Sequence, residues 1–112
     1  MEKRTLNKSP EETARLQLHF ELCDILGTKN VYFQPPSSVK MAYPAIVYQL
    51  EDIVNAFANN NVYGSRRKYI VTLIDPNPDS PFIKPLGEMS TCRFMRFYVS
   101  EGLNHYVFTM FH

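Results

Sequence analysis

The chain has 112 residues, a hydrophobic fraction of 45% and a formal net charge of +1 at pH 7. This length fits one domain, 1–112, and the near-neutral charge gives no bulk electrostatic reason to expect binding to nucleic acid or membrane. The N-terminus leads into polar residues rather than an apolar run, so we expect no signal peptide. No segment approaches the ~20 apolar residues that span a bilayer. We therefore expect one soluble domain made inside a cell.

The first predicted element is a helix from Ser9 to about Leu26, after a polar stretch, 1–8, that we expect to be flexible. Ser9 suits the N-cap, Pro10 suits the first helical position, and a glutamate three residues after the cap completes a capping box. Gly27 offers a left-handed C-cap. The expected core stripe consists of Ala14, Leu18, Leu22, Ile25 and Leu26.

A second apolar patch lies on roughly the opposite side of this helix and consists of Leu16, Phe20 and Cys23. One interpretation is that the patch meets a partner subunit. The other is that it is incidental, because single exposed apolar residues are common on monomers. We expect both cysteines, Cys23 and Cys92, to be free thiols in a reducing compartment.

Two strands are predicted next, at 31–33 and 45–50, followed by an excursion over 51–65 that we read as a long loop between antiparallel strands. The strongest strand signal is at 66–75, where β-branched and aromatic residues run together. Pro76, Pro78 and Pro81 cannot donate to a ladder, so that strand must end in a stiff loop.

The last part of the chain predicts a short irregular helix at 82–89, a strand at 92–100, a turn at 101–104 and a final strand at 105–111. Strict alternation would place Phe94, Arg96 and Tyr98 on one face of the strand at 92–100. The fold class expected from this order is α+β, a two-layer sandwich of about five mainly antiparallel strands, an N-terminal helix and a short second helix. Several strands are apolar on both faces, which predicts an oligomer because so few helices cover only one face.

No residue pattern predicts chemistry, so we expect no enzyme, no cofactor and no metal. Asp75, Asn77 and Asp79 have the spacing of half a calcium loop, but Ser80 replaces its glycine and Leu86 its bidentate glutamate. The three histidines, His19, His105 and His112, have no ligand spacing. Gly-rich phosphate loops and nucleophile elbows are absent from the sequence.

The basic run Arg66-Arg67-Lys68, close to Tyr63 and Tyr69, is compatible with a nucleic-acid contact. It is more typical of a solvated strand entry, where lysine and arginine discourage edge-to-edge pairing.

At this point the pattern resembles the tail terminator (tail completion) proteins of siphovirus-type phages and prophages. The similarity covers nearly the whole chain and is one of segments and their order. It is carried by the N-terminal helix, Val31 to Ser37, Tyr43 to Tyr48, Arg66 to Asp75, Asn77 to Ser80, Arg96 to Tyr98 and Leu103 to Thr109.

The resemblance implies a non-enzymatic virion protein, made in the bacterial cytoplasm and placed at the head-proximal end of the tail. Such subunits form a homo-hexameric ring that caps the tail tube, joins the head–tail connector and lets DNA pass through its lumen without specific binding; no membrane is involved. Under this hypothesis Leu16, Phe20 and Cys23 meet a neighbouring subunit, while Arg66, Arg67 and Lys68 face the lumen or DNA. Two alternatives remain: a related minor capsid or head–tail joining protein, or a small nucleic-acid-binding or regulatory domain that also uses Arg93 and Arg96.

Overall fold

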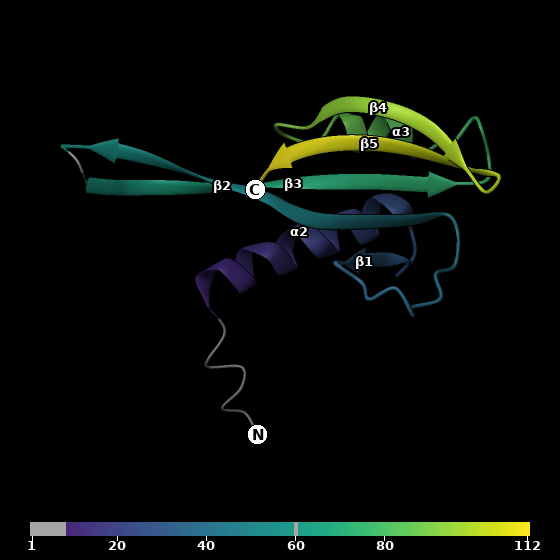
Figure 1. Cartoon of the computed structure of the whole chain (residues 1–112), viewed down its shortest axis with the longest axis horizontal. Helices are drawn as coiled ribbons and strands as arrows, with labels where there is room; N and C mark the ends of the chain where they lie inside the picture. The colour runs from purple at the N-terminus through teal and green to yellow at the C-terminus, as the bar shows by residue number, and fades with distance from the viewer. Residues whose placement is uncertain (1–8, 60) are drawn as a thin grey trace, which may run out of the picture.

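One five-stranded sheet and two helices make up the part of the chain that the computed structural model describes, residues 9–59 and 61–112 (Figure 1). The elements in chain order are α2 (Pro10–Leu26), β1 (Val31–Phe33), β2 (Ala45–Ala58), β3 (Asn61–Asp75), α3 (Ile83–Gly87), β4 (Arg93–Ser100) and β5 (Leu103–Phe111). This confirms the predicted α+β class, the strand number and both helices. The prediction of a flexible segment at 1–8 falls outside the described residues.

Helix α2 begins and ends where its capping residues predict. The Ser9 side chain accepts a hydrogen bond of 3.0 Å from the Glu12 amide, and Pro10 occupies the first helical position. Gly27 adopts the left-handed conformation with φ of 77° and donates its amide to the Cys23 carbonyl. A residue with a Cβ would be strained at that φ.

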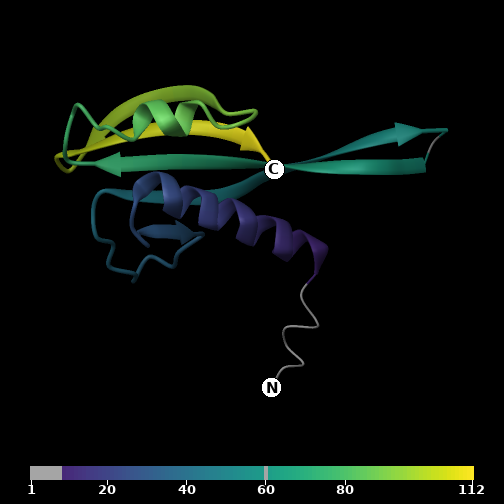
Figure 2. The ribbon, with the colours of Figure 1, turned by 180° about the vertical axis from the view of Figure 1, so that it is seen from behind.

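The strand order in the sheet is β1-β2-β3-β5-β4, with β1 parallel to β2 and every other pair antiparallel. Both helices cover the same face, and they stand in front of the strands in Figure 2 and behind them in Figure 1. We call the other side the open face.

The hydrophobic core lies between the helices and their face of the sheet. Leu18, Leu22 and Leu26 are buried, whereas Ala14 and Ile25 of the predicted stripe are half-buried. From the sheet and α3 the core receives Val31, Ile46, Tyr48, Tyr69, Val71, Leu73, Leu86, Tyr106, Phe108 and Met110. In β3 and β5 these are alternate residues, so one face of each strand is committed to the core.

The predicted loop at 51–65 was wrong. Strands β2 and β3 continue through it, pairing as far as Ala58 with Asn61. Because β5 pairs with β3 only from Lys68 onward, this part of the hairpin has two strands rather than three. It projects from the rest of the molecule (Figure 1, left). We call residues 51–67 without residue 60 the arm.

Two details of the final hairpin also differ from the prediction. A register shift between Phe94 and Arg96 makes Met95 an extra residue, so side chains after it change face. Phe94 therefore shares the helix-covered face with Phe97, and not with Arg96 and Tyr98 as strict alternation predicts. The turn consists of Glu101 and Gly102 alone, and the strand resumes at Leu103 rather than at residue 105.

Candidate interaction surfaces

The arm is one surface that a monomer leaves uncovered. Ile53 and Val54 are 43% and 44% exposed, although both are aliphatic. Their partners in β3 are Arg67 and Arg66, so the two aliphatic side chains point to opposite sides of the ribbon. A two-stranded hairpin in water is marginally stable by itself. The arm therefore exposes apolar surface on both sides and depends on its root in the sheet.

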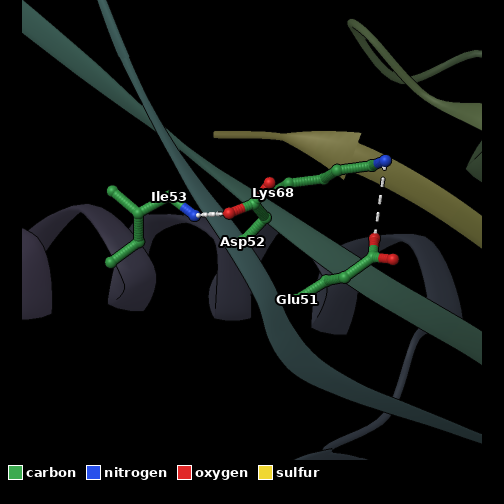
Figure 3. A network of polar contacts seen from close by, with 4 residues as sticks. All are labelled: Glu51, Asp52, Ile53 and Lys68. Carbon is green, nitrogen blue, oxygen red and sulfur yellow. Dashed lines mark hydrogen bonds and ion pairs between the residues drawn. The ribbon is translucent and has the colours of Figure 1, made fainter.

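A bulge marks the root of the arm. The register shift between Leu50 and Asp52 makes Glu51 an extra residue in β2, and such bulges bend a strand and increase its twist. The Glu51 carboxylate lies 3.6 Å from the Lys68 ammonium, and the Asp52 carboxylate accepts a 2.8 Å hydrogen bond from the Ile53 amide (Figure 3). Because the Ile53 amide already donates to Asp52, fewer backbone groups at the outer edge of the arm are free to pair with another strand.

The edge strand β4 is a second uncovered surface. All eight of its residues are exposed, and it has β5 on one side only. Phe94, Phe97 and Val99 are 55%, 49% and 57% exposed. On the helix-covered side Phe94 packs edge-to-face on Phe108, and Phe97 packs on Tyr106. Long apolar edge strands of this kind are templates for pairing with another chain.

The basic run at 66–68 is divided between the two faces of the sheet. Lys68 pairs with Phe111, and Arg66 stacks over the Phe111 ring at 4.5 Å, so both basic side chains lie on the open face. Arg67 alternates to the helix-covered face, where it lines a small hollow with Arg15 of α2. The three cations are therefore consecutive in the sequence, but their side chains do not lie on one face of the sheet. Tyr69 is buried in the core, and the side chain of Tyr63 falls outside what the structure describes.

The open face gains two cations that lie far away in the sequence. Arg93 pairs with Thr109 and Arg96 with Val107, the β5 residues that point away from the core. The guanidinium of Arg96 lies 5.7 Å from the centre of the Tyr98 ring, on the same face. The bulge at Met95 is what gives Arg93 and Arg96 a common face.

The predicted patch on α2 is smaller in the structure than in the sequence. Phe20 is 62% exposed, Leu16 is half-buried, and Cys23 packs against the core. Burial, with the neighbouring Asp24, raises the pKa of the Cys23 thiol. Burial also raises the pKa of Cys92 to about 11. Both thiols are free, and both pKa values disfavour the reactive thiolate.

The proline-rich loop after β3 uses its polar groups internally. The Asp75 carboxylate accepts from the Asn77 amide and the Asn77 side chain accepts from the Asp79 amide, each at 2.9 Å. From β5, the Asn104 amide group donates to the carbonyls of Asp75 and Pro76, and the Tyr106 hydroxyl to that of Pro78. The apparent half calcium loop is therefore a pair of side-chain turns fastened to β5.

The three histidines have separate environments. His19 lies against the buried hydroxyl of Tyr48, and His105 stacks on Tyr98 with ring centres 4.5 Å apart. His112 approaches the Glu21 carboxylate at 3.9 Å. Across residues 9–59 and 61–112, no group of three or more histidine, cysteine, aspartate or glutamate side chains could hold a metal ion.

Small hollows occur beside the N-terminal half of α2. One has a volume of about 160 Å³ and is lined by side chains that include Arg15, Phe33 and Tyr69. Another, of similar volume, lies between Pro10, Arg67 and His112. Both are below the ~300 Å³ at which small-molecule sites begin.

The described helices include none that is long and apolar enough to cross a membrane. Comparison of the whole sequence with protein families and with curated proteins finds no match.

Proposed function

We propose that this protein is a structural subunit that assembles head to tail into a ring, as the resemblance to phage tail terminator proteins implies. In that role the ring caps the tail tube, joins the head connector and encloses the passing DNA. The observation that carries the proposal is that one chain has two uncovered surfaces, the projecting arm and the edge strand β4.

The positions of these surfaces are compatible with a ring. The arm extends from β2 and β3, whereas β4 lies at the sheet edge beyond β5. A contact between the arm of one copy and β4 of the next joins two different patches, and is heterologous when the second copy directs its own arm to a third copy rather than back to the first. Heterologous contacts generate rings when the rotation closes.

Both surfaces are apolar. The β2 side of the arm exposes Ile53 and Val54, and β4 exposes Phe94, Phe97 and Val99. Burial of these side chains would stabilise the contact.

A second candidate function is a small nucleic-acid-binding or regulatory domain, which the cations of the open face favour. A related head–tail joining protein would share the ring architecture and differ only in its place in the particle. Both candidates keep the non-enzymatic assignment.

The test is to shorten the arm without disturbing the sheet. Val54 and Arg66 are direct partners in the hairpin, so residues 55–65 can be replaced by Asn-Gly, a two-residue turn that closes at that pair. Purified wild-type and shortened proteins are compared by size-exclusion chromatography with light scattering, alone and with assembled tail tubes as a template. We expect the wild type to form a discrete ring and the shortened protein to remain a folded monomer, whose circular dichroism spectrum changes only by the strand residues removed.

A matched control replaces the exposed pair Lys84 and Glu88 of the α3 region, which form an ion pair with each other, by glutamines. This variant should assemble like the wild type. A wild type that stays monomeric at high concentration and on tail tubes would refute the ring. Rings of normal size from the shortened protein would show that the arm is not the contact.

A further inference from the structure

We propose that the open face of the sheet binds the phosphodiester backbone of nucleic acid without reading its sequence. This inference rests on the placement of charges on one face, and it does not require the arm–β4 contact. Of the five basic residues that the sequence suggests for such binding, Arg67 leaves the set because it lies on the helix-covered face.

Strand register brings the basic residues of the open face into one band. Cross-strand rows of the sheet can be followed from the arm toward the turn at Glu101 and Gly102. They are Lys68–Phe111, Ile70–Thr109–Arg93, Thr72–Val107–Arg96 and Ile74–His105–Tyr98, with Arg66 one step beyond the first row. Four cations thus spread over β3 and β4, with Thr109 and Val107 of β5 in the rows between them.

Two of the arginines are held in orientations that suit phosphate. Arg66 stacks over Phe111 and Arg96 lies over Tyr98, which itself stacks on His105. Stacking on a ring restrains the guanidinium plane and leaves its N–H edges free for bidentate hydrogen bonds. These arginines therefore lose less side-chain conformational entropy on binding phosphate than unrestrained lysines would.

The acidic side chains near this face lie at the root of the arm and have partners of their own. Glu51 pairs with Lys68, whereas Asp52 accepts from the Ile53 amide and keeps its negative charge at the root of the arm. The remaining positive charge on the face is carried by Arg66, Arg93 and Arg96, all three exposed. A band of separated cations fits a polymer with regularly spaced charges, whereas a single small anion would meet only one of them. Nucleic acid is that kind of polymer.

The experiment measures fluorescence anisotropy of a labelled 20-base-pair duplex of mixed sequence with the full chain, between 50 and 200 mM salt. For three neutralised phosphates the affinity should fall roughly 40-fold over this range, since log K changes by about 0.9 per phosphate for each decade of salt. Arg66→Gln, Arg93→Gln and Arg96→Gln should each weaken binding and reduce the salt slope by about 0.9. The triple variant should lose measurable binding.

Arg67→Gln is the matched control, because it removes the same charge from the neighbouring position but on the helix-covered face. It should change the affinity by less than about 2-fold, within the effect of net charge alone. Equal weakening by Arg67→Gln and Arg66→Gln would overturn the inference, as would salt-independent or undetectable binding by the wild type. Tighter binding to poly-glutamate than to the duplex would overturn it in favour of an acidic protein partner.

Light scattering on the same samples separates this inference from the proposed function. Rings that fail to bind duplex would overturn the inference and leave the ring assembly intact. A monomer that binds duplex through the three arginines would support the inference and contradict the ring. Circular dichroism of each variant excludes unfolding as the cause of lost binding.

Discussion

The imidazole Nδ1 of His19 lies 2.8 Å from the hydroxyl oxygen of Tyr48, whose side chain is fully buried between α2 and the sheet. Arg15, one helical turn earlier, donates to the same oxygen at 3.3 Å. Since Arg15 has no acceptor atom, the Tyr48 hydroxyl accepts from Arg15. When His19 is neutral with its proton on Nε2, the hydroxyl can donate its own proton to Nδ1.

This arrangement predicts that the protein loses stability as the pH falls below neutrality. Burial and the nearby Arg15 charge lower the pKa of His19, so below pH 6.5 the unfolded chain binds more protons than the folded one. Stability contributed by neutral His19 is therefore complete above pH 6.5 and declines as the pH drops toward the folded-state pKa. Urea unfolding at pH 7.5 and pH 5 should show a lower midpoint at pH 5. In His19→Gln, which keeps an acceptor, this difference should shrink; an equal difference would place the pH dependence elsewhere.

Removal of the Tyr48 hydroxyl should destabilise the fold by more than the loss of one hydrogen bond, because Arg15 and His19 both bond to it. Tyr48→Phe preserves the packing of the ring but leaves Arg15 and His19 without that partner in a half-buried position. The expected loss is about 1–2 kcal/mol in the free energy of unfolding. Tyr43→Phe, at a ring that is 40% exposed, is the control and should change stability by less than about 0.5 kcal/mol. Similar losses in the two variants would mean that the hydroxyl network contributes nothing.

Asn104 fastens the proline-rich loop to the sheet. Its buried side chain donates to the carbonyls of Asp75 and Pro76 at 3.0 and 3.3 Å. Asn104→Ala should lower the free energy of unfolding by about 2 kcal/mol, because it removes two hydrogen bonds at a buried site. The amides of Asn77 and Asp79 should exchange faster by hydrogen-exchange NMR. Gln49→Ala, at an exposed position of β2, should leave both measurements unchanged.

Local signals were sufficient to predict α2, because Ser9, Pro10 and Gly27 act through neighbouring backbone groups. One error that matters for the interaction surfaces came from a bulge. Met95 inserts one residue into β4, and no residue type predicts such an insertion. Without it, strict alternation assigns Arg96 to the side of Phe94 and hides the basic band.

The arm could not be predicted for a different reason. Asn59 and Gly64 have the composition of a loop, and a strand there has only one neighbour to pair with. What makes it a strand is the continuation of the β2–β3 register past the end of β5, a tertiary relationship. The role of Asn104 was missed for a similar reason, since an asparagine next to a turn reads as part of the turn until its buried partners are known.

The apolar patch on α2 gives a prediction that separates interface from core. Leu16→Asp with Phe20→Asp should prevent ring formation and leave the fold intact, since Phe20 is mostly exposed and Leu16 half-buried. Cys23 is excluded from this test because it packs against the core. Gln17→Asp, at an exposed position of the same helix, controls for added negative charge. Normal assembly of the double variant, measured by light scattering, would show that the patch is not an interface.

The free edge of β4 gives a sharper test of how neighbouring copies meet. Glu101 and Gly102 form a two-residue turn with φ of 54° and 77°, so Ser100 and Leu103 are the hydrogen-bonded pair that closes the hairpin. Antiparallel pairing alternates, so Val99 directs its N–H away from β5 and Tyr98 directs its N–H toward it.

Proline should therefore have opposite effects at these adjacent positions. Val99→Pro removes an N–H that the hairpin does not use, so the monomer should stay folded while strand pairing at this edge is blocked. Tyr98→Pro removes a bond between β4 and β5 and should destabilise the monomer by about 3 kcal/mol or more, by analogy with proline in other hydrogen-bonded segments. Urea unfolding gives monomer stability, and light scattering gives assembly. If Val99→Pro forms normal rings, neighbouring copies meet β4 through side chains alone, and the contact is packing rather than an extension of the sheet.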